Sequence, residues 1–176
     1  HCEALLRLPE QIEQILENEE LFKPVAERFS KASSIFFIGR GLDYSISLEG
    51  SLKLKEISYI KSEAYAAGEL KHGTISLIEP GTPVFAVATQ PDLFEKTLGN
   101  IREVKSRGAY VAALVGEDCE NAGEFSDVAI KVPSTLPEYM PSLNVVPLQL
   151  IAYFTAVGRG CDVDKPRNLA KSVTVE

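Results

Sequence analysis

Short apolar segments that alternate with helical segments are the feature of this chain that most restricts its fold. The apolar segments, each a candidate strand, span residues 34–38, 83–88, 110–115 and 127–132. The candidate helices that separate or follow them span residues 43–60, 92–106 and 142–157. Strands that are apolar on both sides are typical of parallel sheets covered on both faces, with helices as crossovers. The sequence therefore predicts a doubly wound, three-layer α/β/α fold with a mainly parallel sheet.

Two shorter amphipathic segments, residues 8–16 and 21–29, precede the first candidate strand. Each carries apolar residues at helical spacing, with acidic residues near its start. The length of 176 residues fits a single domain. We therefore expect lead-in helices over residues 1–31, one α/β domain over 32–160 and a C-terminal tail over 161–176. The tail is short and has no strong periodicity, as is common in frayed termini.

Charge and hydropathy exclude two classes of partner. With 18 Lys and Arg against 25 Asp and Glu, and without a basic cluster, the chain lacks the positive surface that nucleic acids and anionic membranes require. The most apolar stretch, residues 145–157, contains Pro147 and Gln149 and is shorter than the roughly 18 residues of a membrane span. It predicts a buried helix, and we expect neither nucleic acid nor a membrane as a partner.

The three cysteines are odd in number and too far apart for a disulfide framework or a CxxC-type metal site. They are Cys2, Cys119 and Cys161. The N-terminus has no charged segment followed by an apolar one, so nothing in it indicates secretion. We expect a cytoplasmic protein that uses neither a metal nor a cofactor.

Two turns follow candidate strands, at the edge of the sheet where open α/β proteins bind their ligands. Gly39-Arg40-Gly41 has the location of a phosphate-binding turn, but it lacks a third glycine and a Lys-Ser/Thr pair, so a plain tight turn is favoured. In the second turn, Thr89-Gln90-Pro91-Asp92, the aspartate is placed to cap the next helix, and its carboxylate would compete with an anion.

The helix predicted over residues 43–60 carries charges in an unusual place. At about 100° per residue, one apolar arc holds Ile46, Leu54, Ile57 and Ile60, and another holds Leu48, Leu52 and Tyr59. A polar arc, predicted to face water, holds Ser47, Ser51, Lys55 and Ser58. Glu49, Lys53 and Glu56 fall between the apolar arcs, so we expect them to be partly buried and coupled. They form either a structural salt bridge or a tuned acid/base pair in a cleft.

His72, one of only two histidines, lies in a glycine-bracketed turn over residues 68–73. A lone histidine in a loop is usually a surface residue. Histidine also exchanges a proton near pH 7, so a position near the Glu49–Lys53–Glu56 cluster would suit proton transfer. In the C-terminal tail, Lys171 is otherwise an exposed, inert amine.

Three long segments, taken together, resemble a known family. Residues 50–60, 63–73 and 162–176 are similar, in this order, to the C-terminal isomerase part of the glutamine:fructose-6-phosphate aminotransferases, or glucosamine-6-phosphate synthases. The resemblance extends over nearly the whole chain from about Leu8. It implies a sugar-isomerase (SIS) fold of flavodoxin-like or Rossmann-like type and, more narrowly, the second of two tandem SIS subdomains.

The resemblance also implies roles for individual residues. Glu56 matches the carboxylate that moves a proton between sugar C1 and C2, and His72 matches the histidine that assists ring opening from across a dimer interface. Lys171 matches the tail lysine that meets the open-chain ketose by Schiff-base chemistry. The implied substrate-binding positions are Glu49, Lys53 and Ala170.

By this resemblance, the chain contributes to making glucosamine 6-phosphate from fructose 6-phosphate and glutamine-derived ammonia, in hexosamine biosynthesis. The implied partners are a sugar phosphate, a first SIS subdomain, a glutaminase domain and a second copy in a homodimer. The family's Ser/Thr-rich phosphate loop and its glutaminase cysteine have no counterpart here, and Thr74 stands where the family often has proline. We therefore expect the chain alone to be inactive. The alternatives are a regulatory sugar-phosphate-binding module without catalysis, and a folded subdomain that binds nothing tightly.

Overall fold

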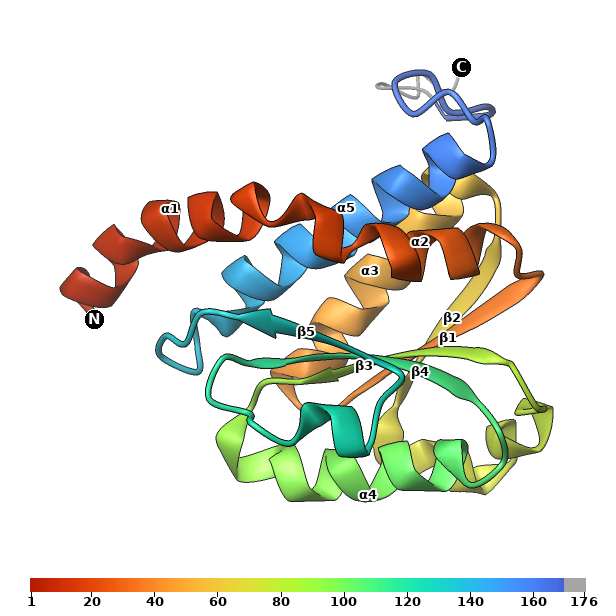
Figure 1. Cartoon of the computed structure of the whole chain (residues 1–176), viewed down its shortest axis with the longest axis horizontal. Coiled ribbons are helices and arrows are strands. Elements are labelled where there is room, and N and C mark those ends of the chain that lie inside the picture. The colour runs from red at the N-terminus through yellow and green to blue at the C-terminus, as the bar shows by residue number, and fades with distance from the viewer. Residues whose placement is uncertain (170–176) are drawn as a thin grey trace, which may run out of the picture.

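A five-stranded parallel sheet with helices on both faces forms the centre of the protein (Figure 1). The computed structural model describes residues 1–169. The strands are β1 (Ser34–Gly39), β2 (Lys61–Ala66), β3 (Pro83–Ala88), β4 (Tyr110–Gly116) and β5 (Val128–Val132). They follow one another in the sheet as β2-β1-β3-β4-β5, and every pairing is parallel. The predicted doubly wound α/β architecture is therefore confirmed.

The five α-helices within residues 1–169 divide unequally between the two faces of the sheet. They are α1 (Cys2–Glu17), α2 (Lys23–Ser30), α3 (Leu42–Ser58), α4 (Phe94–Lys105) and α5 (Met140–Gly158). The 3-10 turns are η1 (Glu19–Leu21), η2 (Ala67–His72), η3 (Thr74–Leu77), η4 (Pro91–Leu93) and η5 (Ala122–Glu124). As Figure 1 shows, α1, α2, α3 and α5 lie on one side of the sheet and α4 lies on the other.

Alternate side chains of the strands fill two separate cores. In β1, Ile35 and Phe37 join the core beneath α3 and α5, whereas Phe36 and Ile38 join the core beneath α4. This is the alternation that the pleat of a strand imposes. Because both faces are covered, β3 is buried at every residue, which explains why it is continuously apolar in the sequence.

Strand β2 is not among the strands predicted from the sequence. Its residues Lys61–Ala66 read KSEAYA, and most of them are only partly buried. Because β2 is an edge strand with a single neighbour, β1, it does not need the apolar composition of the central strands. Its one fully buried polar side chain, Ser62, exchanges hydrogen bonds with Ser51 of α3.

The prediction that the serine arc of α3 faces water was wrong. Ser47, Ser51 and Ser58 are buried, whereas Leu48 and Leu52 are 47% and 43% exposed. A serine hydroxyl in a helix can donate a hydrogen bond to the backbone carbonyl one turn earlier. Ser47 Oγ donates to Asp43 O at 2.7 Å, and Ser58 Oγ donates to Leu54 O at 2.6 Å. Small serine side chains also let α3 pack closely onto the sheet and α5.

The buried C-terminal helix is confirmed, and α5 is longer than the sequence suggested. Of the helices in residues 1–169, α5 alone has the length and apolar composition to cross a membrane. Its side chains Leu143, Leu148 and Ile151 instead belong to the core beneath α3. The apolar composition of α5 is therefore accounted for by packing within the domain.

Candidate active site

Glu49, Lys53 and Glu56 lie together on successive turns of α3. Lys53 Nζ donates to Glu56 Oε2 at 2.6 Å and lies 3.7 Å from Glu49 Oε1. The three side chains are 39%, 34% and 28% exposed, in chain order. The prediction of a partly buried, coupled cluster is confirmed.

Its surroundings keep the Lys53 side chain positively charged. The hydrogen bond with Glu56 raises the pKa of Lys53 above its ordinary value, partial burial opposes this, and the attraction of both carboxylates adds to the rise. Lys53 therefore stays protonated at neutral pH, which disqualifies it as a nucleophilic amine. Its chemistry is to orient the Glu56 carboxylate and to hold it beside a positive charge.

Within one copy of the chain, His72 and this cluster lie on elements that pack against opposite faces of the sheet. It ends η2, whose residues Ala67 and Leu70 pack in the core on the α4 side of the sheet. Neighbouring Lys71 pairs with Glu103 of α4 at 2.6 Å, while His72 itself is exposed. Because β2 leads into a segment on the other face of the sheet, His72 does not join the carboxylate–lysine cluster of its own chain. The resemblance implies that it acts from across a dimer interface, which stays a prediction.

Two residues assigned by resemblance, Ala170 and Lys171, lie outside the described residues. The last part of the chain that the structure describes, residues 159–169, leaves the end of α5 and passes the C-terminal end of α3. This described segment therefore reaches the helix that carries Glu56.

The turn after β3 is occupied by the side-chain carboxylate of Asp43. The Asp43 carboxylate accepts hydrogen bonds from the backbone N–H of Thr89 (2.8 Å), from its hydroxyl (2.7 Å) and from the N–H of Gln90 (3.1 Å). Asn144 of α5 donates to the same hydroxyl at 2.7 Å. Burial raises the pKa of Asp43, and the hydrogen bonds from Thr89 and Gln90 work against the rise.

This arrangement corrects the sequence analysis at two positions. Asp92, expected to cap α4, makes no side-chain capping bond there. Asp43, which the sequence analysis placed only at a helix start, is the carboxylate that occupies the turn. Its signal in the sequence was an acidic residue in the first turn of a helix, which is too common to single out a buried anion.

The Gly39-Arg40-Gly41 turn is packed as a tight turn. A Cβ at Gly39 would come within 2.6 Å of the Asp43 backbone, and Gly41 has a φ of +56° that favours glycine. The Arg40 guanidinium donates to Asn100 Oδ1 of α4 at 2.9 and 3.1 Å. These observations support the plain-turn alternative.

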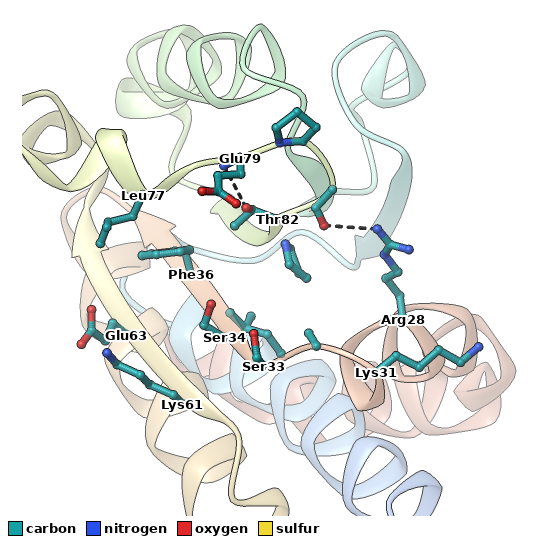
Figure 2. A pocket seen from close by; sticks show the side chains of 15 residues that line it. Arg28, Lys31, Ser33, Ser34, Phe36, Lys61, Glu63, Leu77, Glu79 and Thr82 are labelled. Carbon is teal, nitrogen blue, oxygen red and sulfur yellow. Dashed lines mark hydrogen bonds between the residues drawn. The ribbon is translucent and has the colours of Figure 1, made fainter.

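A cavity of about 560 Å³ lies at the opposite edge of the sheet, beside the amino ends of β1, β2 and β3 (Figure 2). Its lining mixes cations with carboxylates: Arg28, Lys31 and Lys61 with Glu63 and Glu79. Arg28 already donates to the Gly81 carbonyl at 3.2 Å. The lining therefore has three cations against two carboxylates, and none of the predicted site residues that the structure describes lines it. The cavity indicates no particular ligand.

No metal centre is evident in the described part of the chain, where no group of three or more His, Cys, Asp or Glu side chains converges. Cys2, Cys119 and Cys161 are free thiols. The α3 cluster itself consists of two carboxylates and one ammonium group.

The curated relatives and solved structures similar to this chain agree with one another. The isomerizing glutamine–fructose-6-phosphate aminotransferase of Caldanaerobacter subterraneus is 57% identical over 172 residues, which cover 98% of this chain and 28% of that protein. The corresponding protein of Clostridium tetani is 54% identical and is matched over 29% of its length. The chain thus spans less than a third of the curated relatives it matches.

Among the solved structures, the similarity is to the C-terminal domain of such an aminotransferase. The C-terminal domain of glucosamine-fructose-6-phosphate aminotransferase from Francisella tularensis superposes with a TM-score of 0.88 at 36% identity, over 93% of this chain and 46% of that one. Glucosamine-6-phosphate deaminase from Thermotoga maritima gives a TM-score of 0.70 at 28% identity. The resemblance to the C-terminal isomerase part of the aminotransferases is confirmed. A model of the SIS domain matches residues 28–158, and the chain belongs to the SIS domain family.

Proposed function

We propose that this chain supplies one part of a composite active site that converts fructose 6-phosphate and glutamine-derived ammonia into glucosamine 6-phosphate. The Lys53–Glu56 pair on α3 carries the proposal, because it places a half-buried carboxylate beside a permanent cation. Moving a proton between two adjacent sugar carbons needs such a base, held in a fixed orientation over the substrate. The names of the aminotransferase relatives support the choice of reaction.

Each residue has a distinct part in this proposal. Glu56 takes the proton from C1 of the open-chain ketose derivative and returns it to C2, while Lys53 orients the carboxylate and Glu49 completes the polar wall. Lys171 provides an amine for attack on the ketose carbonyl, which requires its unprotonated form. Ala170 belongs to the same substrate-binding tail.

His72 enters the site from a second copy of the chain. Because η2 and α3 lie on opposite faces of the sheet, His72 and Glu56 of one copy do not share a substrate. A homodimer that brings η2 of one copy to α3 of the other supplies both groups to each site. The full enzyme then needs two copies, each with a first SIS subdomain and a glutaminase domain, in the cytoplasm.

The phosphate of the substrate binds outside this chain in the proposal. The turn after β3 has its N–H groups bonded to Asp43, so a phosphate there would meet a carboxylate instead of free donors. We expect purified chain alone to form no glucosamine 6-phosphate above a heat-killed control. Sustained product formation would contradict the need for the other domains.

Subunit complementation in the full-length aminotransferase tests the composite site. Two inactive variants, Glu56→Gln and His72→Asn, are unfolded, mixed in equal amounts and refolded, so that half of the dimers contain one copy of each. Such a mixed dimer has one site with both native residues, and activity should recover to about a quarter of wild type. A Glu56→Gln and Lys53→Met mixture is the matched control and should not recover. Absence of recovery in the first mixture, with mixed dimers present by native mass spectrometry, would reject the shared site.

A further inference from the structure

Tyr59, the residue that ends α3, has an unusual backbone conformation. Its φ of 61° and ψ of 17° place it in the left-handed region, which aromatic side chains seldom adopt. Helices often end on a left-handed residue, but that position normally belongs to glycine or asparagine. A bulky residue at such a position indicates that its side chain makes contacts that glycine could not make.

The side chain of Tyr59 makes two contacts with one residue far along the sequence. Its hydroxyl oxygen accepts a hydrogen bond from the backbone N–H of Arg167 at 2.9 Å. The Arg167 guanidinium lies over the Tyr59 ring, with its central carbon 4.1 Å from the ring centroid. Stacking of this kind combines dispersion with cation–π attraction. We refer to these two contacts as the tail clamp.

The chain between α5 and the tail clamp is also fixed at several points. Arg159 donates to the carbonyls of Ser58 (3.0 Å) and Ser30 (2.9 Å), and Cys161 N–H donates to Ala156 O at 2.9 Å. The Asp162 carboxylate then accepts the N–H groups of the second and third residues after it, both at 3.0 Å. The path to Arg167 is therefore set by local hydrogen bonds and ends on α3.

The tail clamp joins the two parts of the proposed site. Tyr59 follows Glu56 by three residues at the end of the same helix. Lys171 follows Arg167 by four residues, and four residues of fully extended chain span at most about 14 Å. Fastening Arg167 to Tyr59 thus limits how far Lys171 can lie from the end of α3.

We propose that Tyr59 and Arg167 are positioning residues, which register the tail that carries Lys171 against the helix that carries Glu56. Neither residue touches the reacting atoms in this proposal, which rests on the function proposed above. Loss of the tail clamp should lower the rate of the chemical step more than the affinity for sugar, because the phosphate and the Lys53–Glu56 pair still bind.

Hydrogen exchange of the full-length aminotransferase tests the tail clamp without reference to activity. Tyr59→Asn tolerates the left-handed conformation but removes ring and hydroxyl, and Tyr59→Phe removes the hydroxyl alone. Both should speed exchange of the Arg167 amide, with the larger effect in Tyr59→Asn. Tyr153→Asn is the matched control, since Tyr153 is 45% exposed on α5, and it should leave exchange unchanged. Unchanged exchange in Tyr59→Asn would overturn the proposal.

Steady-state kinetics of the same variants test the positioning role. Tyr59→Asn and Arg167→Ala should lower kcat for synthesis about tenfold or more, with KM for fructose 6-phosphate changed less than twofold and glutamine hydrolysis retained. Arg167→Lys should restore part of the rate, because it keeps the charge and loses the planar stack. If the Arg167 amide exchanges faster while kcat stays normal, the tail clamp only stabilises the structure, and the positioning role is overturned. The proposed function fails separately, if Glu56→Gln isomerises normally.

Discussion

Glu56 and His72 lie on opposite faces of one parallel sheet, Glu56 on α3 and His72 at the end of η2 beside α4. The parallel sheet lies between α3 and α4 (Figure 1). Apolar side chains are buried on both of its faces. Because the sheet and the apolar cores on both of its faces separate the two groups, a monosaccharide cannot contact both groups of one copy. A site that uses both groups therefore has to take them from two copies of the chain.

Replacement of Glu56 by glutamine should abolish isomerisation in the full-length enzyme while leaving sugar binding largely intact. The amide keeps the shape of the side chain and loses the base, so kcat should fall by about 10²–10⁴ with little change in KM. Deuterium exchange at C1 and C2 of the sugar measures the proton transfer directly. Glu124→Gln, an exposed carboxylate of η5 that has no part in the proposed site, is the control and should retain the exchange. Normal exchange in Glu56→Gln would reject Glu56 as the proton carrier.

Loss of the Asp43 carboxylate should destabilise the domain strongly. In Asp43→Ala the N–H groups of Thr89 and Gln90 lose their acceptor inside the protein, which should cost about 2–4 kcal/mol. Asp43→Asn keeps one acceptor oxygen and should cost less. Urea unfolding followed by circular dichroism gives both values. A change below about 0.5 kcal/mol in Asp43→Ala would show that the turn satisfies its donors without Asp43.

The sequence predicted those parts of the fold in which a single pattern dominates. Residues 83–88 are apolar throughout and form β3 with the predicted bounds, because a central strand is buried on both faces. The pairing of Lys53 with Glu56 also followed from helical spacing, since residues three apart share a face.

The remaining features depend on packing between segments distant in the sequence. Polarity does not reveal that the serines of α3 face the core, because their hydroxyls bond to the helix itself. An edge strand such as β2 carries no strong apolar signal. The position of His72 depends on which face η2 takes after β2, and only the tertiary structure decides this.

Close packing between α3 and α5 predicts opposite effects for the same substitution at two glycines. A Cβ at Gly50 would lie 3.0 Å from the side-chain carbons of Leu148, whereas a Cβ at Gly99 of α4 meets nothing within 4 Å. Gly50→Ala should therefore destabilise by about 1–3 kcal/mol through overpacking. Gly99→Ala should stabilise by about 0.5–1 kcal/mol through higher helix propensity. Thermal unfolding of the two variants decides this, and a stabilising Gly50→Ala would mean that the Leu148 side chain moves aside at little cost.

The ion pair between Lys71 and Glu103 should make the His72 segment sensitive to acid. The hydrogen bond from Lys71 holds the pKa of Glu103 below its ordinary value of 4.5, with burial opposing the shift. A carboxyl whose pKa is lowered by folding stabilises the folded state above its unfolded pKa, and this contribution is lost as pH falls through the folded value. At pH 6, Glu103→Gln should show faster hydrogen exchange over residues 67–73 than wild type.

As the pH falls from about 5 to 3, exchange of wild type over these residues should approach that of Glu103→Gln, because both then lack the charge on residue 103. Comparing the two proteins at each pH removes the intrinsic pH dependence of exchange. Glu124→Gln, an exposed carboxylate of η5, is the matched control and should follow wild type throughout. A difference between wild type and Glu103→Gln that persists undiminished at pH 3 would show that the pair does not hold η2 against α4.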